Sequence, residues 1–148
     1  LLTKFNKKFS RYSSTVPSFE QSALALFMHR GHFERHINKM KRIYKGQRDM
    51  LIETISRHPL HPFIRIIGED TGLHLLLEVH IGLTENQLLQ IANRQKIHIF
   101  GLCQYFHQKV ANLPQNIVIL GYSGLALSEI QQGIQLLLDS WAQAVNIT

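Results

Sequence analysis

The hydrophobic period of this chain changes at a proline-bounded turn, and that change constrains the fold more than any other feature. Before the segment 58–62, which contains two prolines, apolar residues recur three, four or seven positions apart, as on one face of a helix. After it, apolar runs at 63–67 and 73–81 flank the turn-like segment 68–72, which predicts two strands. Helices followed by strands predict an α+β fold, here a two-layer sandwich in which a small mixed or antiparallel sheet packs against helices.

Capping residues and breakers divide the chain further. Ser18 with Gln21 predicts a capping box, and Thr84 and Ser128 predict the N-caps of two later helices. The predicted helices span 1–12, 18–28, 32–57, 84–93 and 128–145. The later predicted strands span 97–100, with a continuation over 102–106 after Gly101, and 117–120. The predicted core comprises Ile37, Met40, Tyr44, Leu51, Leu75, Leu77, Ile119, Ile134 and Leu138.

The length of 148 residues is that of one domain. Within it we expect a linking helix at 1–16, a helical part at 17–58, and the sheet with its closing helices at 59–148.

The chain is basic, with a formal net charge of +6 and a pI of about 9.7. The excess positive charge is concentrated at 4–11 and 30–48, in stretches that read as amphipathic helices whose outer faces carry charge in any case. Few aromatic residues interleave with the basic ones, so no stacking platform for single strands is indicated. A solvated or partner-facing surface is therefore favoured, and a stand-alone basic nucleic-acid-binding domain is kept as an alternative.

Cys103 is the single cysteine, so no disulfide can form within the chain, and a lone thiol suits a reducing compartment. It has no neighbouring base in the sequence and is expected to be a buried, inert thiol. No apolar run approaches the ~20 residues of a membrane span, and no secretion signal is evident. We therefore expect a cytoplasmic location and no membrane partner.

Nine histidines raise the question of a metal site. His29, His32 and His36 are three and four positions apart, but Gly31 interrupts the helix there and no cysteine or carboxylate cluster completes a ligand set. We expect these to be surface and interface histidines, and we expect no metal.

Two other groups of polar residues have a structural explanation. His58 and His61 are expected to cap or solvate the proline-bounded turn. Glu69 and Asp70 are adjacent carboxylates in a strand-connecting turn, where aspartate and glycine are favoured for backbone reasons, so catalysis is not expected there.

Six short strings follow one another along the chain. They are P-S-F-E-Q-S-A-L-A-L-F from 17, H-I-x-x-M-x-x-x-Y-x-x-x-R-D-x-L from 36, G-L-H from 72, I-F-G-L from 99, L-G-Y from 120 and S-E-I-x-x-G from 128. In this order they resemble the C-terminal small subdomain of MocR/GabR-type bacterial transcription regulators, which belong to the GntR superfamily. The resemblance covers essentially the whole chain.

The resemblance implies a fold like that of the small domain of fold-type-I aminotransferases. It implies a homodimeric, pyridoxal-phosphate-dependent transcription regulator of amino-acid, D-alanine-ligase or vitamin B6 metabolism. The DNA-reading domain and the large cofactor-binding domain would lie upstream of this chain, so no covalently bound cofactor is expected here.

The partners implied are the large domain, a second subunit, and a small amino-compound or dipeptide effector, with DNA bound only through the absent N-terminal domain. The chain would be aminotransferase-like without being an enzyme. The small domain of a genuine pyridoxal-phosphate-dependent aminotransferase is the alternative.

The resemblance also implies three effector-facing candidates, His74, Gln104 and Tyr105, and no catalytic residue. Lys4 lacks the Ser-Lys context of the family's Schiff-base lysine. In members that sense γ-aminobutyrate, an arginine near the G-L segment grips the effector carboxylate, and Gln104 aligns with it. A neutral amide cannot replace a bidentate guanidinium, so it suits an amide, a hydroxyl or a peptide bond better. The other interpretation is that all three are ordinary sheet residues.

Overall fold

The computed structural model describes residues 2–9, 16–68, 72–106 and 116–147. The chain divides into two compact units, 1–41 and 42–148, and helix α3 (His32–Ser56) runs through the division. Glu69 and Asp70 lie outside the described residues, so the prediction for their turn stays a prediction.

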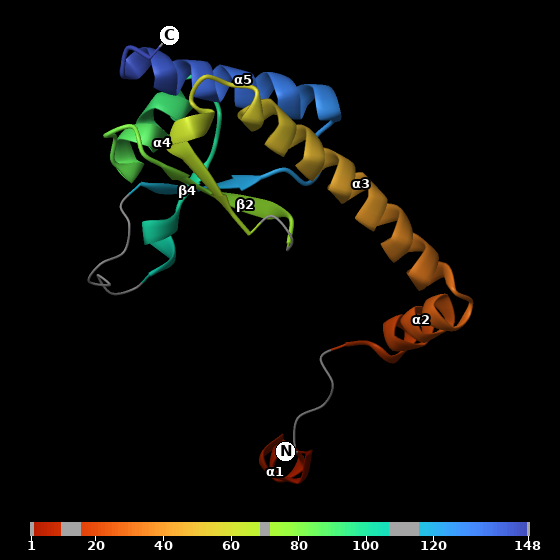
Figure 1. The fold of residues 1–148 in the computed structure, drawn as a ribbon. Helices are drawn as coiled ribbons and strands as arrows, with labels where there is room; N and C mark the ends of the chain where they lie inside the picture. The colour runs from red at the N-terminus through yellow and green to blue at the C-terminus, as the bar shows by residue number, and fades with distance from the viewer. Residues whose placement is uncertain (1, 10–15, 69–71, 107–115, 148) are drawn as a thin grey trace. The chain divides into compact units, whose positions relative to one another are not determined.

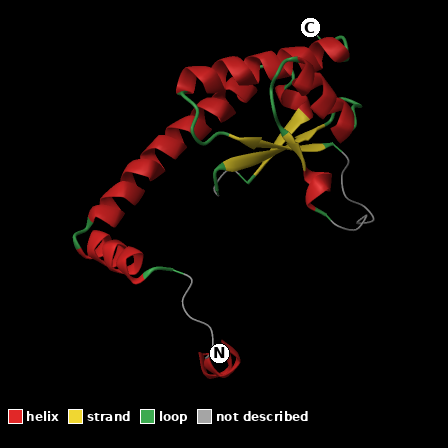
Figure 2. Cartoon of the chain, turned by 180° about the vertical axis from the view of Figure 1, so that it is seen from behind, coloured by secondary structure: helices red, strands yellow, loops and turns green. Residues whose placement is uncertain are grey.

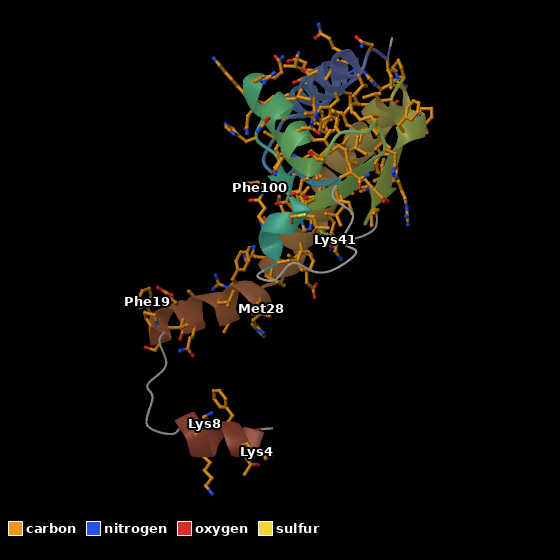
Figure 3. All side chains as sticks on the ribbon, turned by 90° about the vertical axis from the view of Figure 1, so that its left-hand side faces the viewer. Lys4, Lys8, Phe19, Met28, Lys41 and Phe100 are labelled. Carbon is orange, nitrogen blue, oxygen red and sulfur yellow. The ribbon has the colours of Figure 1, made fainter. Side chains whose placement is uncertain are left out.

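The first unit contains helices α1 (Leu2–Phe9) and α2 (Ser18–His29) and the first turns of α3. Figure 3 shows Phe19 and Met28 on α2, in which no residue is buried. No side chain caps α2, and the Gln21 amide donates instead to the carbonyl of Val16 (Nε2···O 2.9 Å). The predicted capping box is therefore wrong, because Ser18 is already the first helical residue.

The second unit contains a four-stranded sheet. Figures 1 and 2 show the α-helices of this unit on one face of the sheet. Its elements after α3 are η1 (His61–Phe63), β1 (Ile64–Ile67), β2 (His74–Val79), α4 (Glu85–Arg94), β3 (Phe100–Gly101), η2 (Leu102–Tyr105), β4 (Ile117–Gly121) and α5 (Leu127–Ala144), where η marks a short 3₁₀ helix. The strands pair in the order β1-β2-β4-β3, and every pairing is antiparallel. The predicted α+β fold is confirmed.

The core lies between the sheet and the helical layer. Strand β2 contributes Leu75, Leu77 and Val79, because alternate side chains of a strand point to the same face. Trp141 of α5 is fully buried, and its indole N–H donates to the carbonyl of Leu88 on α4 at 3.2 Å. The other buried members of this core are Leu51, Ile55, Leu60, Ile64, Ala92, Val118, Leu120, Tyr122, Ile130, Ile134, Leu137, Leu138 and Ala142.

Most of the predicted core is confirmed, with three exceptions. Ile37 and Met40 are half-buried and lie outside the core, because the buried residues of α3 begin only at Gln47. Ile119 is also half-buried, because it alternates with the buried Val118 and points to the opposite face of the sheet. Tyr44 is partly buried against the core. The remaining predicted members, Leu51, Leu75, Leu77, Ile134 and Leu138, are buried.

The predicted caps of the later helices have different outcomes. Thr84 caps α4 as predicted, in a capping box with Gln87. Ser128 does not cap α5, because the helix begins one residue earlier and the carboxylate of Glu129 accepts the N–H of Ala126 at 2.7 Å.

The predicted strand around 97–106 is wrong for most of its length, because only Phe100 and Gly101 pair with β4. The backbone N–H of Cys103 donates to the side chain of Glu85 rather than to a neighbouring strand, and the chain turns into η2.

Candidate functional site on the helix-free face of the sheet

Within the second unit, no described α-helix lies on the face of the sheet opposite the core, and only the 3₁₀ turn η2 lies on that side. We call it the helix-free face. On β2 it holds His74, Leu76 and Glu78, which alternate with the buried core residues of the same strand. Figure 2 shows the helical layer on the other face.

An apolar row crosses this face through all four strands. Leu76 pairs with Ile67 of β1 and with Ile119 of β4, and Ile119 pairs with Phe100 of β3. None of these four residues belongs to the core, and Phe100 keeps 52% of its surface exposed (Figure 3). The row gives the helix-free face an apolar centre.

Polar groups flank the apolar row on one side. The carboxylate of Glu78 lies 3.4 Å from Arg65 Nη1 and 3.5 Å from His80 Nε2. The Arg65 side chain is 71% exposed, so water screens this ion pair and its contribution to stability is small. On the other side of the row, His74 lies opposite Gly121 and is exposed.

The three effector-facing candidates fall into two places. Gln104 and Tyr105 are adjacent and exposed on η2, which lies on the side of β4 turned away from α5 (Figures 1 and 2). They are on a 3₁₀ turn and not on a strand, which corrects the prediction that a strand after Gly101 carries Gln104. His74 lies toward the other end of β4: it pairs with Gly121, whereas the segment leading into η2 pairs with Val118. The two pairing positions on β4, Val118 and Gly121, are three residues apart, which is about 10 Å along the strand.

The segment that carries His74 is fixed by Tyr122. The phenol of Tyr122 donates to the carbonyl of Gly72 at 3.0 Å, and its backbone N–H donates to the carbonyl of Leu73 at 3.3 Å. Burial raises the pKa of the Tyr122 phenol, and the nearby positive charge of Arg48 partly opposes that rise. The G-L-H and L-G-Y strings and the arginine of the longest string therefore meet at this end of the sheet.

The turn that carries Gln104 and Tyr105 is fixed by Glu85, the first residue of α4. Glu85 is buried, and its Oε2 accepts the backbone N–H of Cys103 at 3.1 Å. Cys103 is exposed, so the expected buried thiol is wrong. Partial desolvation raises the pKa of the Cys103 thiol, and the hydrogen bond and negative charge of Glu85 raise it further. Sequence reasoning missed Glu85, since only the three-dimensional fold brings it to Cys103.

The three histidines considered as metal ligands lie on the surface. His29, His32 and His36 are exposed, and His32 stacks on Phe27 and lies 2.7 Å from a guanidinium nitrogen of Arg35. In the part of the chain that the structure describes, no group of three or more His, Cys, Asp or Glu side chains could hold a metal ion.

His58 confirms the expected capping of the proline-bounded turn. It is buried, and its Nδ1 accepts the N–H of Leu60 at 3.1 Å, whereas His61 is exposed.

The residues of this chain do not provide a covalent anchor for pyridoxal phosphate in the expected context, since no lysine in the sequence follows a serine. The helix-free face offers apolar side chains, a histidine and, on η2, an amide and a phenol. Such groups suit non-covalent contacts with a small organic ligand. Over the described ranges, no helix is both long and apolar enough to cross a membrane.

Comparisons with curated proteins give a consistent class, although no family model matches the chain. It is 33% identical over 142 residues to the uncharacterised HTH-type transcriptional regulator YdeL of Bacillus subtilis (strain 168), covering 95% of this chain and 30% of that protein. It is 31% identical over 132 residues to a second such regulator of that organism, YhdI, covering 89% of this chain and 27% of that one. It is 30% identical over 115 residues to the probable rhizopine catabolism regulatory protein MocR of Rhizobium meliloti, covering 77% of this chain and 22% of that one.

Solved structures with a similar fold include aminotransferases. The multiple substrate aminotransferase of Thermococcus profundus matches with a TM-score of 0.69 at 15% identity, covering 82% of this chain and 29% of that one. The kynurenine aminotransferase of Pyrococcus horikoshii matches with a TM-score of 0.68 at 18% identity, covering 80% of this chain and 28% of that one. At these identities the likeness shows the fold alone.

Fold and relatives together define an aminotransferase-like subdomain related to helix-turn-helix regulators. The chain matches the C-terminal subdomain of a MocR-type regulator, and the resemblance inferred from the six strings is confirmed. It spans about 30% or less of the length of the curated relatives it matches.

Proposed function

We propose that the chain is the effector-binding and oligomerisation subdomain of a pyridoxal-phosphate-dependent transcription regulator. The observation that carries this proposal is its 33% identity to an HTH-type regulator over 95% of the chain. The helix-free face supports it, because an apolar row flanked by exposed polar side chains is a surface that another part of a larger protein would cover.

In this proposal the large domain of the same protein holds the cofactor and faces the apolar row. Pyridoxal phosphate would supply an electrophilic carbonyl that reacts with amines. The contribution of this chain is recognition: the Gln104 amide and the Tyr105 phenol can each donate and accept a hydrogen bond. His74 can bind from the other side of the row.

Ligand binding would close this subdomain over the large domain, and the DNA-binding heads of the dimer would follow. A ligand can shift such an equilibrium only by its differential affinity for the two states. Contacts made by His74, Gln104 and Tyr105 only in the closed state would provide that difference.

A genuine aminotransferase is the second candidate, and its support is the aminotransferase fold with TM-scores of 0.67 to 0.69. The two candidates differ in what the parent protein does with an amine.

The test is to purify the full-length parent protein and record its visible absorption with pyridoxal phosphate. Amino acids and dipeptides are then added, with and without a keto acid as amino acceptor. We expect a bound cofactor whose spectrum responds to a ligand and no product from the keto acid. Steady transamination would establish the enzyme and overturn the regulator assignment.

The chain of 148 residues alone is the control for cofactor binding. We expect no stoichiometric cofactor band with it. A band that disappears on substitution of one lysine would contradict the assignment of the anchor to the large domain.

A further inference from the structure

The carboxylate of Glu85 is buried between the start of α4 and the η2 turn. Only 6% of the surface of Glu85 is exposed, and its Oε2 accepts the Cys103 N–H at 3.1 Å. Burying a carboxylate is costly unless hydrogen bonds or charges compensate. Among the described residues no cation forms an ion pair with it, so its compensation comes from the Cys103 N–H and from the positive end of α4.

Gly101 is what allows this carboxylate to approach the chain so closely. A Cβ added to Gly101 would overlap the Glu85 carboxylate. Its backbone angles, φ −89° and ψ 145°, are open to any residue, so space and not conformation requires glycine here. The other strand glycine, Gly121, has nothing within 4 Å of the point where a Cβ would lie, so it serves as a matched control.

The η2 turn depends on outside support. It has four residues, and the hydrogen-bond geometry of a 3₁₀ helix is poorer than that of an α-helix. The Glu85 bond reaches the backbone of Cys103, the residue directly before Gln104. Loss of that bond would leave the turn free to move, and with it Gln104 and Tyr105, the two effector-facing candidates on η2.

We propose that Glu85 is a positioning residue for effector recognition, whose carboxylate holds η2 so that Gln104 and Tyr105 face the ligand. This inference rests on the proposed function. It adds a residue on the helical side of the sheet that controls recognition without touching the effector.

The first arm of the test uses this chain and its single, exposed cysteine as a reporter. Alkylation of Cys103 by iodoacetamide is measured as a function of pH. In Glu85→Gln and Gly101→Ala the profile should shift to lower pH, because a negative charge that disfavours the thiolate is removed or displaced. Glu53→Gln, at an exposed position of α3, and Gly121→Ala should leave the profile unchanged. An unshifted profile in Glu85→Gln would overturn the proposal.

The second arm uses the full-length protein, with dialanine and γ-aminobutyrate as probes and the cofactor spectrum as readout. Glu85→Ala should weaken binding of the preferred probe by about tenfold or more, because small misplacements of positioning groups have effects of that size. Glu85→Gln should bind the preferred probe nearly as well as the wild type does, because glutamine keeps an oxygen acceptor for the Cys103 N–H. Gly101→Ala should behave like Glu85→Ala, and circular dichroism checks that each variant folds.

The outcomes separate the two proposals. If the parent binds a probe and both Glu85→Ala and Gly101→Ala keep the affinity, Glu85 has no positioning role while the proposed function stands. If the parent binds neither probe although the Cys103 profile shifts, effector recognition in the proposed form fails, and the role of Glu85 in it fails too.

Discussion

Leu76 of β2 lies directly opposite Ile119 of β4, and neither side chain packs in the core. Between Ile67 and Phe100 they form the middle of the apolar row. An apolar row on a face that no described α-helix of the second unit covers favours a cover from elsewhere in the parent protein. Substitutions in the row should therefore separate the folding of this chain from the assembly of the parent.

Ile119→Lys is expected to change the unfolding free energy of this chain by less than about 1 kcal/mol, since a half-exposed position can solvate the ammonium. In the full-length protein the same change should weaken retention of pyridoxal phosphate, because a charge would be pressed against the large domain. Denaturant unfolding and cofactor absorption are the measurements. Val118→Lys, one residue away and fully buried, should unfold both proteins. Equal losses from the two variants would contradict the assignment of faces.

Leu77→Ala should lower the unfolding free energy by about 2–5 kcal/mol, because Leu77 is fully buried and its removal leaves a cavity. Leu76→Ala, the neighbour on the helix-free face, should lower it clearly less. Chemical denaturation of the chain measures both. A loss below about half a kcal/mol for Leu77→Ala would show that Leu77 does not pack in the core.

Tyr122→Phe removes the hydrogen bond to Gly72 and should cost about 0.5–1.5 kcal/mol near neutral pH. Burial raises the pKa of the Tyr122 phenol in the folded state, so the folded protein disfavours the phenolate. The contribution of the neutral phenol is complete below the unfolded pKa of about 10 and is lost as the pH rises through the folded pKa. Unfolding measured from pH 8 to 11 should therefore show a steeper alkaline loss in the wild type than in Tyr122→Phe. Parallel profiles would exclude this linkage.

His58 is held in one tautomer by its two partners. Its Nδ1 accepts the Leu60 N–H, so the proton lies on Nε2, which donates to Asp139 Oδ1 at 3.0 Å. His58→Ala should cost about 1–3 kcal/mol because it leaves the Leu60 N–H without its acceptor. Asp139→Asn should cost little, since Asp139 is 57% exposed and asparagine keeps an oxygen acceptor. A larger loss in Asp139→Asn than in His58→Ala would reverse this assignment.

The sequence was sufficient for the features that repeat along the chain. The change of period at the two prolines predicted the α+β order, and Thr84, predicted as an N-cap, marked the start of α4. Ser18 and Ser128 failed as caps because a capping residue acts only if the helix begins directly after it. At α5 the carboxylate of Glu129 accepts the N–H of Ala126 instead.

The site could be predicted only in part. His74 was placed on a strand correctly, but alternation alone could not assign Ile119 to the helix-free face, because the residues on either side of it are apolar too. The η2 turn was missed because a contact from Glu85, eighteen residues away in the sequence, ends the strand at Gly101. Contacts of this kind depend on the tertiary fold and leave no periodic signal.

The most direct test of the account is the affinity of the full-length protein for its operator DNA, measured during titration with γ-aminobutyrate and dialanine. We predict that dialanine changes DNA affinity more than γ-aminobutyrate does, because Gln104 offers an amide where a carboxylate would need a guanidinium. Gln104→Arg should shift the preference toward γ-aminobutyrate by about 1.5–3 kcal/mol if the charged pair forms. This chain alone should show no salt-dependent DNA affinity, whereas a stand-alone basic nucleic-acid-binding domain would show it. DNA affinity that responds to neither ligand, or a ligand ranking that Gln104→Arg leaves untouched, would contradict the assignment of this subdomain as the effector-reading part of a regulator.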